Sequence, residues 1–109
     1  MDIQVETLDD CRIVRLRGKI TYECCPEFES RMDPVLKDPA REIVLDFREV
    51  PFIDSSGVGE ILRIYKRTRE GGGEVVLLNP NPKLRDLFSM YRFHQFMQIR
   101  EESEMNPHA

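Results

Sequence analysis

The feature that most constrains the fold is a pair of short apolar segments with a helical pattern between them. EIVLDF (residues 42–47) and EVVLL (residues 74–78) are apolar almost throughout, as is typical of strands that are covered on both faces. Residues 71–73 are three glycines, which end the helical pattern. The apolar residues of that pattern share one helical face: Val58, Ile61, Leu62 and Tyr65. A strand–helix–strand order predicts parallel strands joined by a crossover, and therefore an α/β fold.

The N-terminal part of the chain predicts a hairpin. IQVETL (residues 3–8) and CRIVRLRG (residues 11–18) alternate between apolar and polar residues, and Asp9 and Asp10 separate them. Alternation on both sides of a short polar break is typical of two antiparallel strands joined by a tight turn.

Prolines and capping residues set the expected limits of two further helices. Residues 21–37 have an apolar helical face, but Pro34 lacks an N–H group and clashes with the preceding turn. We therefore expect this helix to kink or to stop early near Asp33. Asn81 is a favoured N-cap, and Pro82 is favoured as a first helical residue, so another helix should begin there.

Together these segments predict one domain with the order β-β-α-β-α-β-α-β. FMQI (residues 96–99) supplies a last short strand. We expect a mixed sheet of four to five strands with flanking helices over residues 1–100, and a polar tail over residues 101–109.

Composition excludes several classes of partner. The chain has 109 residues and a formal net charge of −4, so it has no general attraction for nucleic acid or anionic membranes. No apolar run approaches the ~20 residues of a membrane span, and the acidic N-terminus lacks the apolar region of a signal peptide. We predict a cytoplasmic protein that binds neither a metal nor a cofactor. Its cysteines fit no metal-binding spacing and should be free thiols: Cys11, Cys24 and Cys25.

The stretch VPFIDSSGVGEIL (residues 50–62) places polar residues and glycines where a strand gives way to a helix. Helix capping explains part of this stretch, because Asp and Ser oxygens accept the free N–H groups of a first turn. Capping does not explain Gly57 and Gly59, since a glycine costs a helix interior on the order of 1 kcal/mol. The glycines indicate that a group approaches the backbone closely or that the helix start must stay compact.

A catalytic use of Ser55 lacks the residues that it would need. Ile53 and Asp54 stand where a hydrolase elbow requires glycine, and only His94 and His108 could act as a base. A phosphorylation site fits better. A phosphate at a helix N-terminus meets free N–H groups, carries a charge of about −1.5 to −2, and needs no base from this chain.

The motif resembles a known family when its context is included. FIDSSGVGEIL, preceded by EIVLDF and followed by GGGEVVLLN and KLRDLF, is similar to STAS domains of bacterial anti-sigma-factor antagonists, over about residues 3–99. The resemblance implies a protein without catalytic activity that binds an anti-sigma factor, which is also a serine kinase. Phosphorylation by that kinase would weaken binding, and a PP2C-type phosphatase would reverse it.

Carried over by position, the resemblance implies that Ser55 is the phosphoacceptor. The implied partner-binding residues lie in the motif and in the preceding loop: Asp54, Ser55, Ser56, Gly57, Val58, Gly59 and Thr21.

The sequence departs from the family at three places. Relatives commonly carry acidic residues where this chain has Lys19 and Thr21, often carry a glycine where it has Arg92, and usually lack the helix interruption at Pro34. The altered loop keeps a second hypothesis open, in which the chain is a non-catalytic scaffold module of a larger signalling assembly without a sigma-factor partner. The oligomeric state, monomer or weak dimer, also stays open.

Overall fold

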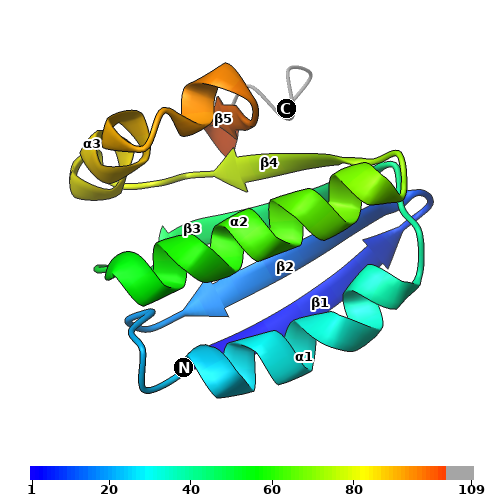
Figure 1. Cartoon of the computed structure of the whole chain (residues 1–109), viewed down its shortest axis with the longest axis horizontal. Coiled ribbons are helices and arrows are strands. Elements are labelled where there is room, and N and C mark those ends of the chain that lie inside the picture. The colour runs from blue at the N-terminus through cyan, green and yellow to red at the C-terminus, as the bar shows by residue number, and fades with distance from the viewer. Residues whose placement is uncertain (103–109) are drawn as a thin grey trace.

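A computed structural model describes residues 1–102 of the protein, which form a five-stranded sheet with flanking helices (Figure 1). The strands lie in the order β1-β2-β3-β4-β5, with β1 and β2 antiparallel and the others parallel. The strands are β1 (Asp2–Leu8), β2 (Cys11–Arg17), β3 (Glu42–Glu49), β4 (Glu74–Leu78) and β5 (Gln98–Arg100). The helices are α1 (Cys25–Lys37), α2 (Ser55–Glu70) and α3 (Pro82–Met90), and a 3-10 turn, η1, spans Phe93–Gln95.

The main core lies between the sheet and the helices. Helices α1 and α2 cover the same face of the sheet (Figure 1). Strand β3 is central, and its neighbouring residues Val44 and Leu45 are both 0% exposed although they point to opposite faces. The largest buried side chains of the core are aromatic: Phe28, Phe47, Phe88 and Phe93. The predicted α/β architecture and its element order are therefore confirmed.

Local sequence signals predicted several element boundaries correctly. The β1–β2 hairpin pairs Leu8 with Cys11 around a turn in which Asp9 has a φ of 53°. Helix α2 ends at Glu70, directly before the three glycines. Helix α3 begins at Pro82, and the Asn81 side chain accepts a hydrogen bond of 2.9 Å from the Leu84 N–H. These boundaries depend on neighbours in sequence, which explains why the sequence predicted them.

We predicted that α1 would kink or stop early near Asp33, and the early stop is wrong. The helix starts at Cys25, with Pro26 in its first turn, and continues through Pro34 to Lys37. A proline in a helix interior costs about 3 kcal/mol. Burial on both sides of the proline offsets this loss: Phe28 and Met32 are fully buried before it, and Val35 and Leu36 pack against the core after it.

The C-terminal end of the sheet also differs from the prediction. The last strand is Gln98–Arg100 rather than residues 96–99, because η1 folds around the fully buried Phe93 and sets the strand start later. Arg92 has a φ of 60°, a left-handed conformation that glycine adopts without strain. This conformation suits the glycine that the family resemblance leads us to expect at this point.

No helix in the described range is both long and apolar enough to cross a membrane. The predicted polar tail over residues 101–109 falls mainly outside the described residues, which end at Glu102.

Candidate functional site

The candidate site is the Asp54 turn, which we define as residues 54–59. It follows β3 and forms the start of α2, with Asp54 as the N-cap and Ser55 as the first helical residue. Ser55 and Ser56 are both exposed, and Asp54 is half-buried. The hydroxyl predicted to be the phosphoacceptor is therefore accessible to another protein.

The carboxylate of Asp54 joins two segments of the chain. Its Oδ1 accepts a hydrogen bond of 3.1 Å from the Gly57 N–H, and its Oδ2 accepts one of 3.0 Å from the Tyr22 N–H. The first bond caps α2, and the second bond holds the loop between β2 and α1. Asp54 thus fixes the position of the loop relative to the start of α2 through backbone groups of both segments.

Main-chain contacts hold the same loop against the Asp54 turn. Ile20 and Ile53 form a parallel bridge, the Ile20 N–H donates to the Phe52 carbonyl at 3.0 Å, and the Asp54 N–H donates to the Ile20 carbonyl at 3.0 Å. Thr21, which is half-buried, follows directly. The structure therefore brings Thr21 next to the motif, although its partner-binding role stays a prediction.

The two glycines of the turn differ in their surroundings. A Cβ on Gly57 would lie 2.6 Å from Ile53 Cγ2 and 2.8 Å from Ile20 Cγ2, so only glycine lets the loop approach so closely. A Cβ on Gly59 would have no heavy atom within 4 Å. Close packing therefore explains the glycine at position 57. Packing does not explain Gly59, which leaves backbone without a side chain on an exposed surface.

Burial divides the predicted docking residues into three groups, of which the half-buried Asp54 and Thr21 form one. Val58 is 2% exposed and belongs to the main core, and Gly57 is buried as well. These two residues shape the turn from inside. The residues that present surface are Ser55, Ser56 and Gly59.

Two of the first-turn N–H groups of α2 are already occupied. The Gly57 N–H donates to the Asp54 side chain, and the Val58 N–H donates to the Asp54 carbonyl at 3.1 Å. A phosphate on Ser55 would therefore meet the positive end of the helix dipole but would compete with Asp54 for the Gly57 N–H. Its negative charge would lie beside a carboxylate.

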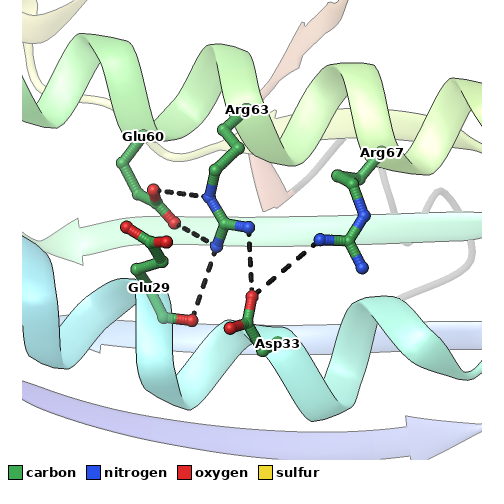
Figure 2. A network of polar contacts seen from close by, with 5 residues as sticks. All are labelled: Glu29, Asp33, Glu60, Arg63 and Arg67. Carbon is green, nitrogen blue, oxygen red and sulfur yellow. Dashed lines mark hydrogen bonds and ion pairs between the residues drawn. The ribbon is translucent and has the colours of Figure 1, made fainter.

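A network of charged side chains behind the turn was not predicted (Figure 2). The Arg63 guanidinium donates to both carboxylate oxygens of Glu60, each at 2.8 Å, to Asp33 Oδ1 at 3.0 Å and to the Glu29 carbonyl at 3.4 Å. Arg67 lies 3.9 Å from the same Asp33 oxygen. The hydrogen bond to Glu60 is the largest of the effects that raise the pKa of Arg63, so this side chain stays charged.

The network joins the middle of α2 to α1. Glu60 is only 6% exposed, and its charge is matched by the two-pronged contact with Arg63. The spacing of Glu60 and Arg63 on one helix was a sequence signal for that pair. Nothing in the sequence pointed to Asp33, which lies on another helix.

Cys24 and Cys25 are free thiols beside the Asp54 turn. Burial, and then the neighbouring Cys24 and Asp54, raise the pKa of Cys25 to about 11, so its thiol stays protonated at neutral pH. The Cys24 thiol lies 3.2 Å from the Thr21 carbonyl and 3.3 Å from the Thr21 N–H, and supports the loop. Within residues 1–102 no group of three histidine, cysteine, aspartate or glutamate side chains is placed to hold a metal ion.

Comparison with known proteins identifies the family. The model of the STAS domain family matches residues 2–105 of the chain. The protein therefore belongs to the STAS domain family.

The relatives are consistent in their names. The chain is 31% identical over 107 residues to an anti-sigma F factor antagonist of Paenibacillus polymyxa, covering 97% of this chain and 91% of the relative. Among solved structures, a putative anti-sigma factor antagonist from Thermotoga maritima superimposes with a TM-score of 0.84 at 24% identity, covering 90% of this chain and 85% of that one. The phosphorylated form of the Bacillus cell fate determinant SpoIIAA gives a TM-score of 0.75 at 24% identity, covering 95% and 96%. These two structures support the fold.

Proposed function

We propose that this chain is an anti-sigma factor antagonist that binds its anti-sigma factor through the Asp54 turn and is switched off by phosphorylation of Ser55. The observation that carries the proposal is the exposed Ser55 at the first position of α2, in an intact D-S-S-G motif. A curated relative that covers nearly the whole chain is named an anti-sigma factor antagonist, which supports the assignment.

The charge of the phosphate explains how one modification could release the partner. The unmodified turn presents two hydroxyls and bare backbone at Gly59, so a partner can approach closely. Phosphorylation adds a charge of about −1.5 to −2 next to the Asp54 carboxylate. A partner surface that fits the unmodified turn would then face an uncompensated negative charge, which weakens binding without unfolding the domain.

The chain contributes no catalytic group to this switch. The anti-sigma factor would act as the serine kinase and supply the base and the nucleotide, and a PP2C-type phosphatase would remove the phosphate. The chain itself would need no cofactor. Both partners would meet it in the cytoplasm.

The test is a pull-down from the native cell with three variants of the chain. We expect Ser55→Ala to retain the anti-sigma factor and Ser55→Asp to lose it, because the aspartate places a negative charge at the phosphoacceptor position. Ser89→Asp is the matched control, since it places the same charge at an exposed serine near the end of α3, outside the Asp54 turn, and it should bind like wild type. Equal recovery of the same partner by Ser55→Asp and wild type would contradict the proposal.

The loop at Lys19 and Thr21 favours one alternative, a scaffold role in a larger signalling assembly. The loop is fixed against the Asp54 turn, so its side chains belong to the same surface as Ser55. A lysine and a threonine where relatives carry acids would alter which partner docks there. A stable large assembly in size-exclusion chromatography, without phosphate incorporation by any co-occurring serine kinase, would favour the scaffold role.

A further inference from the structure

A hollow of about 170 Å³ lies beside the Asp54 turn. It opens between the segment that joins β3 to α2 and the first turns of α3. Its lining is apolar except at one position: Pro51, Phe52, Ile53, Lys83, Leu84 and Leu87. The hollow therefore adjoins the proposed docking surface, because Ile53 directly precedes Asp54.

Phe52 is the most distinctive residue of this lining. Phe52 is 46% exposed, although the next residue, Ile53, is 3% exposed and Val50, two residues before it, is 1% exposed. The backbone around it is fixed, because the Ile20 N–H donates to the Phe52 carbonyl at 3.0 Å and the Asn81 amide donates to the Val50 carbonyl at 3.4 Å. An exposed aromatic side chain on a fixed backbone is typical of a residue that anchors a protein–protein contact, since little backbone freedom is lost on binding.

A positive charge lies at the edge of the hollow. Lys83 is exposed and forms no ion pair with any side chain of residues 1–102. It stands in the first turn of α3, which carries no acidic residue. A cation at the positive end of a helix dipole is unfavourable. A carboxylate of a partner would be attracted both to the Lys83 ammonium and to the positive end of the α3 dipole.

We propose that the anti-sigma factor inserts an apolar side chain into this hollow, against Phe52, and places a carboxylate next to Lys83. The inference rests on the proposed function and extends it from the Asp54 turn to the start of α3. The contact would add apolar burial and a charge pair to a turn that offers mainly hydroxyls and backbone. Lys83 would then select a partner with an acidic docking edge.

The test measures binding by isothermal titration calorimetry, with the purified kinase that wild type retains in the pull-down as the probe. We expect Phe52→Ala to weaken binding by ~10- to 30-fold, as for anchor residues of other interfaces. Lys83→Glu should weaken it roughly fivefold, with the largest loss at low salt, because an exposed charge pair is screened. The matched control is Met90→Ala, since Met90 is 70% exposed at the far end of α3 and should bind like wild type.

The outcomes separate this inference from the proposed function. Circular dichroism and thermal unfolding first establish that each variant is folded. If Phe52→Ala and Lys83→Glu bind as tightly as wild type while Ser55→Asp does not bind, the hollow is outside the interface and the switch stands. If Ser55→Asp binds like wild type while Phe52→Ala does not, the hollow is supported and the switch fails.

Discussion

Two polar clamps hold α2 in place, and they use different kinds of contact. The Asp54 clamp is the carboxylate that binds the Gly57 and Tyr22 N–H groups. The Arg63 clamp is the guanidinium that binds Glu60, Asp33 and the Glu29 carbonyl. The first clamp lies at the tip of the helix, and the second lies along its middle.

The difference explains how a rigid site can keep its exposed side chains free. The Asp54 clamp is formed by one side chain and two backbone N–H groups. The side chains of Ser55, Ser56 and Tyr22 therefore remain available to a partner. The Arg63 clamp is formed by charged side chains on both helices, and one of these side chains, that of Glu60, is buried. We infer that the Arg63 clamp contributes mainly to stability and the Asp54 clamp mainly to the shape of the docking surface.

Removing Arg63 should have the largest effect on stability. Arg63→Leu leaves the buried Glu60 carboxylate without its partner, and breaking a buried pair from one side costs about 3 kcal/mol. Urea unfolding would measure the change. The double variant Glu60→Leu/Arg63→Leu should recover most of it, because no buried charge is left unpaired. Equal stability of the single variant and wild type would show that the network does not join the helices energetically.

The two glycines of the turn should respond oppositely to a methyl group. Gly57→Ala places a Cβ within 3 Å of Ile53 and Ile20 and should destabilise the fold by about 2 kcal/mol through overpacking. Gly59→Ala meets open space, so it should stabilise the helix by up to about 1 kcal/mol. Thermal unfolding compares the pair. If both variants lose the same stability, Gly57 is not required by the approach of the loop.

The smallest effect should come from Asp54→Asn, which removes only one arm of the Asp54 clamp. The amide oxygen can still cap α2, but the amide nitrogen cannot accept a hydrogen bond from the Tyr22 N–H. We expect a loss of about 1 kcal/mol. Hydrogen exchange should be faster at Tyr22 and unchanged at Gly57. Unchanged exchange at Tyr22 would mean that the carboxylate does not hold the loop.

The contacts of the Asp54 turn and of the Arg63 clamp differ in how far the sequence could predict them. Capping by Asp54 and the position of Ser55 at the helix start follow from residues that are adjacent in the chain. The bond to Tyr22, the approach of Ile20 to Gly57 and the contact of Asp33 with Arg63 join residues far apart in sequence, so no local pattern reveals them.

The same distinction applies to the fold. The hairpin, the start of α3 at Pro82 and the end of α2 at Glu70 were predicted from local signals. The early stop expected at Pro34 does not occur, because burial of α1 against the core outweighs the local effect of the proline. The last strand was placed too early, because the buried Phe93 sets the geometry of the turn before it.

The central claim is that phosphorylation at Ser55 switches partner binding. The most direct measurement phosphorylates the wild-type chain with the purified anti-sigma kinase, maps the phosphate by mass spectrometry and compares the affinity of the two forms for that kinase by calorimetry. We predict that the phosphate lies on Ser55, that affinity falls at least ~10-fold, and that a PP2C-type phosphatase restores it. Phosphorylation of Ser56 instead of Ser55, or equal affinity of the two forms, would contradict the claim.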